Sequence, residues 1–221
     1  MPIKERKPRA LIYLVRHGET QENRDGIIQG QKDTFLNAMG ERQAHSVGQR
    51  LKTTKIDLLI SSDLQRAVNT ADAIAAHHPG LEIVKQKELR ERDMGPHREG
   101  LKLTAVAGLA PPTETSAMFS KRVMEWWNRQ VLGSILSIRS SQEEPLTVVV
   151  TTHGGVITTL IKDLVGSRKA RVGKDVAISK CFNASITLVE IGESGKGIIT
   201  QYGDISHLSE SALESNADIP H

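Results

Sequence analysis

The segment LTVVVTTHGGVITTLIKDLVG, residues 146–166, places a predicted strand, a histidine and a predicted helix in direct succession. Its first part is a short apolar run rich in valine, which is typical of a fully buried strand. His153, Gly154 and Gly155 then separate this run from a helix pattern that continues to Gly166. A buried strand that leads at once into a helix is the building unit of layered α/β proteins with a parallel sheet.

Other segments repeat this alternation. The further predicted strands are RALIYLVRH (9–17), IDLLISSD (56–63), LEIVKQKEL (81–89), ASITLVEI (184–191) and GIITQYG (197–203). The further predicted helices run from a cap at Asn37 to about Leu51, from Leu64 to His77 with Ser62 or Asp63 as the cap, and from about Thr115 to Ile138. The pattern predicts a three-layer α/β/α sandwich with a mostly parallel central sheet.

A chain of 221 residues suits one domain with one substantial core. We expect that domain to span 11–207, after a flexible leader at 1–10 and before a disordered tail at 208–221, which lacks apolar periodicity. The segment 90–114 mixes glycine, proline and charged residues, and we expect it to form an irregular insert over the active site.

Composition argues against several classes of function. The 29 basic and 26 acidic residues are scattered, and with three Phe, two Trp and two Tyr the chain lacks the basic patch and stacking rings of a nucleic-acid-binding protein. No apolar stretch approaches the roughly 20 residues that span a bilayer. Cys181 is the one cysteine, so no internal disulfide can form; we expect it to be a small buried residue rather than a nucleophile. We expect a cytoplasmic protein, with a nuclear location as the alternative, and leave open monomer or homodimer.

Candidate catalytic residues follow the predicted strands. Ligands of parallel sheets bind beyond the carboxyl ends of the strands, where His17 and His153 both lie directly before glycine. Arg16 precedes His17, Arg66 lies one turn into the helix after the second strand, and Glu91 follows the third strand. Two arginines, two histidines and a carboxylate suit a phosphomonoester: the guanidinium groups hold the phosphoryl oxygens, one histidine attacks phosphorus, and an acid protonates the leaving oxygen.

The ordered motifs of the chain resemble the histidine phosphatase superfamily, also called the phosphoglycerate mutase-like family. The resemblance runs from about Leu11 to Ile191, and LRERDMG with the later PPTET is similar to the small fructose-2,6-bisphosphatase-like and broad-specificity phosphatases within it. The matching stretches are RHGET with Asn23, QG at Gln29 and Gly30, DTFLNAMGERQA, SSDLQRAVNTA, LRERDMG and THGGV.

This resemblance implies a phosphatase that acts on small phosphomonoesters, such as sugar phosphates, without metal or other cofactor. It implies that His17 becomes a phosphohistidine and that Glu91 donates a proton to the leaving group and then activates water. The reacting nitrogen of His17 must then be unprotonated, so the opposite nitrogen should donate to a backbone carbonyl, in the Gly18 loop. The expected substrate-binding residues are Arg16, His17, Asn23, Gln29, Gly30, Arg66, Glu91, Arg98, His153 and Gly154.

The chain also departs from the family pattern. It has His97 and Arg98 where many relatives have an aromatic residue and glutamate; Arg98 either contacts a second phosphate or is a solvated charge, and His97 is a second candidate acid. The segment 100–112 looks short for the family, which leaves a smaller or more open cover over the pocket. The alternatives are a cofactor-dependent phosphoglycerate mutase, a catalytically inactive member of the fold that binds a phospho-ligand, and a metallohydrolase, although the eight histidines form neither a His-x-His nor a His-Glu-x-x-His pattern.

Overall fold

A seven-stranded mixed sheet, in the order β3-β2-β4-β1-β6-β7-β5, forms the centre of the computed structural model, which describes residues 7–135 and 144–208. Four of the neighbouring pairs are parallel, and β6 is antiparallel to both β1 and β7. The strands are β1 Ala10–Arg16, β2 Leu58–Ser62, β3 Ile83–Gln86, β4 Leu146–Thr152, β5 Ala170–Val172, β6 Ile186–Ile191 and β7 Gly197–Asp204.

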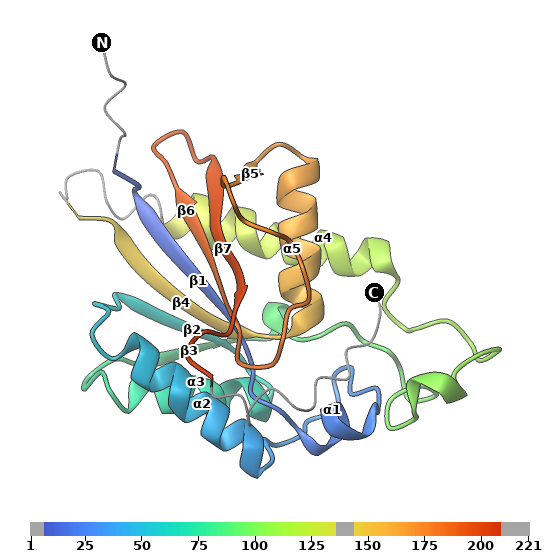
Figure 1. Cartoon of the computed structure of the whole chain (residues 1–221). Coiled ribbons are helices and arrows are strands. Elements are labelled where there is room, and N and C mark those ends of the chain that lie inside the picture. The colour runs from blue at the N-terminus through green and yellow to red at the C-terminus, as the bar shows by residue number, and fades with distance from the viewer. Residues whose placement is uncertain (1–6, 136–143, 209–221) are drawn as a thin grey trace.

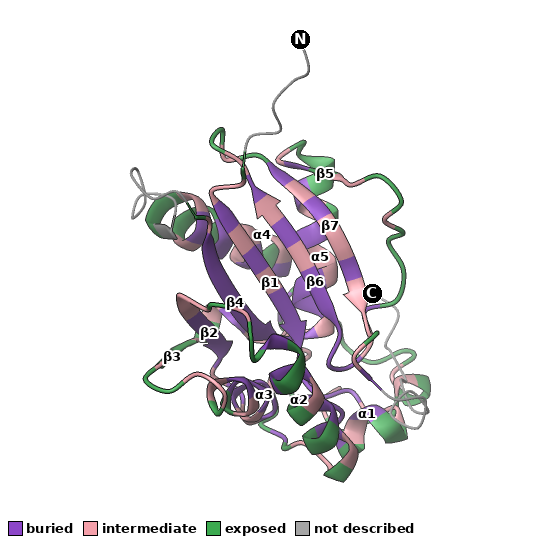
Figure 2. Ribbon diagram, turned by 60° about the vertical axis from the view of Figure 1, so that its left-hand side comes forward, coloured by how far each residue is buried: buried purple, intermediate pink, exposed green. Residues whose placement is uncertain are grey.

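Helices cover both faces of this sheet (Figure 1). On β4, Val148 and Val150 belong to the apolar cluster under α4 and α5, whereas Val149 belongs to the cluster under α2 and α3. This alternation follows from the two-residue period of a strand, and it leaves β4 and much of β1 buried (Figure 2). The predicted α/β/α sandwich is confirmed. The main helices are α2 Ala38–Leu51, α3 Gln65–Ala75, α4 Ser116–Trp126 and α5 Gly154–Gly166.

Several element boundaries differ from the sequence prediction. The predicted cap of α3 at Ser62 or Asp63 is wrong: Leu64 occupies the N-cap without a side-chain bond, and the Asp33 carboxylate accepts from the Gln65 amide at 2.7 Å. Asp63 is unavailable as a cap because it pairs with Arg90. The predicted helix to Ile138 is α4 followed by a π-helical segment, η3 Trp127–Ile135, and the rest of that prediction lies outside the described residues. The short helix α1 Gln21–Asp25 and the strand β5 were not predicted.

The segment 90–114 is irregular, as expected. It follows a short 3₁₀ turn, η1 Lys87–Leu89, and contains a second one, η2 Leu103–Ala105. Its middle runs beside the loop after α1: the Ile28 amide donates to the Leu101 carbonyl at 2.9 Å, and the Gly100 amide donates to the Ile28 carbonyl at 2.8 Å. The insert therefore lies against the loop that follows α1. Of the predicted leader and tail, only residues 7–10 and 208 fall within the described chain.

The first turn of α2 packs directly on the loop after β1. A Cβ atom on Gly40 would lie 2.0 Å from the Glu19 carbonyl oxygen, and one on Gly18 would lie 2.4 Å from the Gly40 carbonyl oxygen. The side chain of Gln43 adds a bond of 2.8 Å from the Glu19 amide. Both glycines are thus required by a close approach of backbone to backbone.

The substitution Gly40→Ala should lower the free energy of unfolding by about 1–3 kcal/mol, because backbone atoms must move to admit the methyl group. Urea denaturation measures this difference. Gly166→Ala is the matched control: it is also helical, and nothing lies within 4 Å of its added Cβ. A Gly40→Ala protein as stable as the Gly166→Ala protein would show that the contact between α2 and the loop is not tight.

Candidate active site

His17 and His153 lie side by side at the carboxyl edge of the sheet. Strands β1 and β4 pair in parallel with Arg16 opposite Thr152, and the His17 amide donates to the Thr152 carbonyl at 2.9 Å. The two imidazole rings have centroids 5.2 Å apart at 61°. Both side chains are buried. The expectation that these two strand ends meet is confirmed.

The hydrogen bond of His17 fixes its tautomer. Its Nδ1 lies 2.7 Å from the Gly18 carbonyl oxygen, which can only accept, so Nδ1 carries the proton. The lone pair of the neutral ring is therefore on Nε2. The Gly18 amide in turn donates to Thr70 Oγ1 at 3.1 Å, which anchors this loop on α3. The contact expected between His17 and the Gly18 loop is present.

Burial lowers the pKa of the His17 imidazole well below its ordinary value, and the charges of Arg66 and Arg16 lower it further, while the Gly18 bond acts in the opposite direction. Burial and Arg66 likewise lower the pKa of His153. Both rings are consequently neutral in the folded protein at pH 7. For His17 this is the form with a free electron pair.

Arg66 holds His153 by a bond of defined direction. Its Nε donates to His153 Nδ1 at 3.2 Å, so the neutral His153 ring carries its proton on Nε2, which lies 2.9 Å from Ser62 Oγ. The other Arg66 donors reach the carbonyls of Gly30 and Lys32 at 2.9 and 2.8 Å. The site thus includes Ser62, which was not singled out from the sequence.

Arg66 is a buried cation that lacks a carboxylate partner. Its side chain is 1% exposed, and within residues 7–135 and 144–208 no carboxylate oxygen lies within ion-pair distance of it. Burial lowers the pKa of the guanidinium to about 10, so it remains charged at neutral pH. A buried charge whose hydrogen-bond acceptors are all neutral is the setting in which an anionic ligand binds well.

Arg16 and the backbone of His17 rest on the loop before β6. Arg16 Nη1 donates to the Cys181 carbonyl at 2.6 Å, and Asn183 Nδ2 donates to the His17 carbonyl at 3.1 Å. A Cβ atom on Gly154 would lie 3.2 Å from Arg16 Nε, so this glycine lets the arginine pass over the start of α5. Cys181 is buried, in keeping with the structural role expected of it. Asn183 was missed, although a polar residue directly before a buried strand is a weak signal.

Asn23 presents an unused donor. Its Oδ1 accepts from the Thr20 amide at 3.2 Å and from Asn183 Nδ2 at 3.1 Å, which fixes the amide orientation. Within the described chain its Nδ2 makes no hydrogen bond, so two N–H groups remain for a ligand. Gln29 differs, because its Oε1 accepts from the hydroxyls of Thr20 and Thr34 at 3.0 and 2.6 Å. Gln29 therefore orders the loop around the site.

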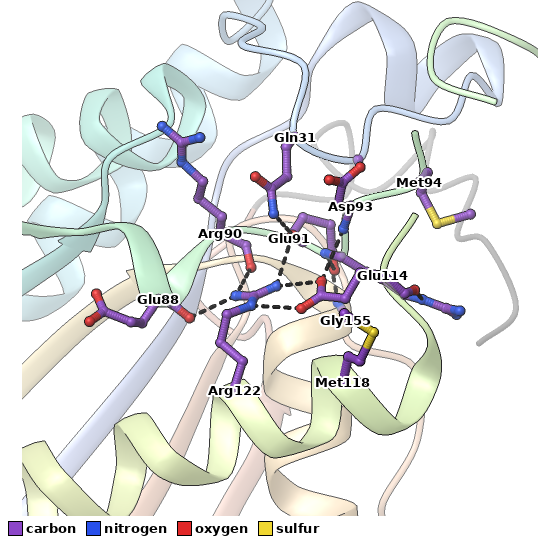
Figure 3. A network of polar contacts seen from close by, with 12 residues as sticks. Gln31, Glu88, Arg90, Glu91, Asp93, Met94, Glu114, Met118, Arg122 and Gly155 are labelled. Atoms are coloured by element: carbon purple, nitrogen blue, oxygen red, sulfur yellow. Dashed lines mark hydrogen bonds and ion pairs between the residues drawn. The ribbon is translucent and has the colours of Figure 1, made fainter. Parts of the chain in front are cut away.

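Glu91 comes from the insert and is held at the start of α5. Its Oε2 accepts from the Gly155 amide at 2.9 Å, and its Oε1 accepts from the Arg92 amide at 2.8 Å (Figure 3). A Cβ atom on Gly155 would lie 2.2 Å from Glu91 Oε1, so the glycine is needed for this approach. Glu91 and Arg16 thus both lie against the first turn of α5, directly after its N-cap residue His153.

Arg98, predicted either to contact a second phosphate or to be a solvated charge, makes its hydrogen bonds within the insert. Its Nε and Nη2 donate to the carbonyls of Ala110 and Leu109 at 2.7 and 3.2 Å, so the guanidinium ties the insert together. The neighbouring His97 is exposed, and no hydrogen bond links it to the site among the described residues. The adjacent Glu99 accepts from the amides of Gln31 and Met94 at 2.9 and 3.2 Å.

No group of three or more His, Cys, Asp or Glu side chains in 7–135 or 144–208 is arranged to hold a metal ion. None of the helices in those ranges is both long and apolar enough to cross a bilayer.

Comparison with known proteins agrees with this geometry. Residues 12–204 match the model of the histidine phosphatase superfamily, branch 1. A probable phosphatase of Schizosaccharomyces pombe is 32% identical over 89% of this chain and 94% of its own length. A probable phosphoglycerate mutase, GpmB of Salmonella arizonae, is 34% identical over 92% of this chain and 97% of its own. The solved structure of phosphoserine phosphatase from Entamoeba histolytica with 3-phosphoglyceric acid superposes with a TM-score of 0.66 at 28% identity, over 90% of this chain and all of that one.

The buried neutral histidines should make stability fall on acidification. Below about pH 6.5 the unfolded chain binds protons on His17 and His153 that the folded protein does not bind, so the free energy of unfolding decreases as pH falls, by up to about 1.4 kcal/mol per pH unit for each ring. His153→Gln should reduce this slope, measured by urea denaturation between pH 7 and 5 in buffer without phosphate. His45→Gln, on the exposed side of α2, should leave it unchanged. Equal slopes in all three proteins would contradict the assignment.

Proposed function

The chain belongs to branch 1 of the histidine phosphatase superfamily, and from that premise we propose that it hydrolyses small phosphomonoesters through a phosphohistidine on His17. One observation carries the proposal: a buried Arg66 with no carboxylate partner among the described residues bonds His153, whose ring centroid is 5.2 Å from that of His17, and His17 bears a lone pair on Nε2. The first group attracts a phosphoryl group, and the second can attack it.

The first half-reaction transfers the phosphoryl group to the protein. His17 Nε2 attacks phosphorus, a bond from nitrogen to phosphorus forms, and the bond from phosphorus to the ester oxygen breaks. The leaving oxygen takes a proton from the carboxyl group of Glu91. Arg16, Arg66 and Asn23 supply N–H groups to the phosphoryl oxygens, on which negative charge is spread in the transition state.

The second half-reaction returns the protein to its starting state. Glu91, now a carboxylate, takes a proton from water, the resulting hydroxide attacks phosphorus, and the bond to His17 Nε2 breaks to release phosphate. Backbone amides bind both oxygens of Glu91, one amide to each oxygen. This leaves each oxygen a further lone pair for the proton, so the same hydrogen bonds serve the acid and the base step.

A small substrate fits both the site and the relatives. The solved structures from Entamoeba histolytica are of a phosphoserine phosphatase with phosphoserine or with 3-phosphoglyceric acid, which are both small phosphorylated molecules. In this chain the insert at 90–114 contributes Glu91 but contains no helix longer than one 3₁₀ turn. We infer sugar phosphates or similar metabolites as the substrate class.

A mutase is the second candidate, favoured by the 34% identity to a probable phosphoglycerate mutase. A mutase must keep its phosphohistidine away from water while the bound substrate reorients. The short irregular insert is a small cover for that purpose, and this favours hydrolysis.

The phosphohistidine can be trapped directly. After brief reaction with p-nitrophenyl phosphate and an alkaline quench, intact mass spectrometry should show the gain of one phosphoryl group, and peptide mapping should place it on His17. His17→Asn should show neither the label nor detectable turnover, because the attacking nitrogen is gone. His45→Asn should retain both. A label on any other residue, or full turnover by His17→Asn, would overturn the proposal.

Product analysis separates phosphatase from mutase. With 3-phosphoglycerate as substrate, we expect phosphate release to exceed the formation of 2-phosphoglycerate. Phosphorus NMR measures both products, with and without a catalytic amount of 2,3-bisphosphoglycerate. Formation of 2-phosphoglycerate well above phosphate release would make the mutase the better assignment.

A further inference from the structure

We propose that Arg122 is a positioning residue for Glu91, and that it holds the main chain from which the Glu91 carboxyl group reaches the phosphoryl site. This inference rests on the function proposed above. Arg122 lies on α4, more than thirty residues along the chain from Glu91. Figure 3 shows its guanidinium in the centre of a network that encloses Glu91.

The guanidinium of Arg122 uses each of its nitrogens. Nη1 donates to the carbonyls of Glu88 and Arg90 at 2.8 and 2.9 Å, and Nη2 donates to the Glu91 carbonyl at 3.3 Å. Nε and Nη2 also bind the two carboxylate oxygens of Glu114 at 2.8 and 2.7 Å. One side chain thus binds three carbonyls within a four-residue stretch that ends at Glu91.

This stretch lies outside the strand ladder, and its link to the sheet is the bond of 2.8 Å from Thr152 Oγ1 to the Leu89 carbonyl. His17 and His153 follow paired strands, whereas β3 ends at Gln86 and only the short turn η1 separates it from Glu91. Carbonyls in such a segment need donors from elsewhere if they are to be held in one conformation. Arg122 supplies three of these bonds, and Gln31 Nε2 supplies a second bond to the Glu91 carbonyl at 3.2 Å.

Glu114 keeps the guanidinium in place and extends the hold. Burial raises the pKa of the Glu114 carboxyl, but the bonds from Arg122 and from the Asp93 amide outweigh it, so the pKa lies below its ordinary value and the group is a carboxylate. Its Oε2 accepts from the Asp93 amide at 3.1 Å, and its carbonyl accepts from Arg92 Nε at 2.8 Å. Arg122 and Glu114 therefore bind the chain on both sides of Glu91.

Two packed helices consequently fix Glu91 from opposite ends. Helix α4 holds its carbonyl through Arg122, and α5 holds its carboxylate through the Gly155 amide. The helices pack through buried side chains and through a bond from Ser120 Oγ to Asp163. A lysine could not replace the arginine, because an ammonium group has three donors and lacks the planar fork that binds a carboxylate and several carbonyls together.

The dependence on the leaving group tests this role. Proton donation matters greatly for an alkyl ester and little for p-nitrophenyl phosphate, whose leaving group is weakly basic. We expect Arg122→Met to lower kcat/KM for β-glycerophosphate about tenfold or more beyond its effect on p-nitrophenyl phosphate. Glu91→Gln should show the same selective loss, but larger.

Arg129→Met is the matched control. Arg129 also contacts residue 88, but through the Glu88 carboxylate at 2.6 Å, and it binds none of the carbonyls at 88, 90 and 91 within the described chain. Its substitution should alter both kcat/KM values equally or not at all. Thermal unfolding and inhibition by inorganic phosphate should show that the variants are folded and retain the anion site. If Arg122→Met does not fold, Arg122→Lys carries the test. We then expect kcat/KM for β-glycerophosphate to fall more than kcat/KM for p-nitrophenyl phosphate, but by a smaller factor than in Arg122→Met.

The outcomes separate the two proposals. Suppose that Glu91→Gln shows the selective loss, but that a folded Arg122 variant loses activity equally on both substrates or loses none. This result would overturn the positioning role and leave the phosphatase assignment intact. A wild-type protein that releases phosphate from neither substrate would overturn the proposed function, and the positioning role with it.

Discussion

The parallel pairing of β1 with β4 is the constraint on which the site depends. Because Arg16 lies opposite Thr152, the residues that follow, His17 and His153, are placed at the same height on the sheet edge. A shift of one residue in this register would turn the alternating side chains of β1 to the opposite faces of the sheet. The buried core on both faces of β4 therefore secures the register, and the register secures the contact between the two rings.

This arrangement collects positive charge among buried side chains. Arg66 is buried among carbonyls, His153 is kept neutral by Arg66 and by burial, and His17 is kept neutral by burial and by both arginines. The pKa values of His17, His153 and Arg66 are all lowered, and the largest cause is the same for each, namely burial away from solvent. The free site is thus prepared for an anion, and a bound phosphoryl group would offset the cost of burying the charge.

The sequence was sufficient to predict most of the sheet, the four main helices and the meeting of His17 with His153, because strand ends followed by His-Gly are local patterns. It failed where a partner comes from a distant segment. The side chain that accepts from the first turn of α3 is Asp33, which no local rule could identify, and Ser62 or Asp63 was predicted instead because both stand directly before the helix. The contact of Arg98 with the carbonyls of residues 109 and 110 was hidden for the same reason, since the insert has no periodicity that predicts its folding.

The site therefore combines two kinds of support with different physical properties. His17, the proposed nucleophile, is fixed by strand pairing, in which many backbone bonds share the constraint and no single side chain is decisive. The carboxyl group is fixed by an irregular segment, in which a few side-chain bonds replace the ladder. An insert of this kind can change in length and sequence without disturbing the sheet. The half of the site that contains His17 and His153 is consequently constrained by the fold, whereas the half that contains Glu91 is free to differ between relatives.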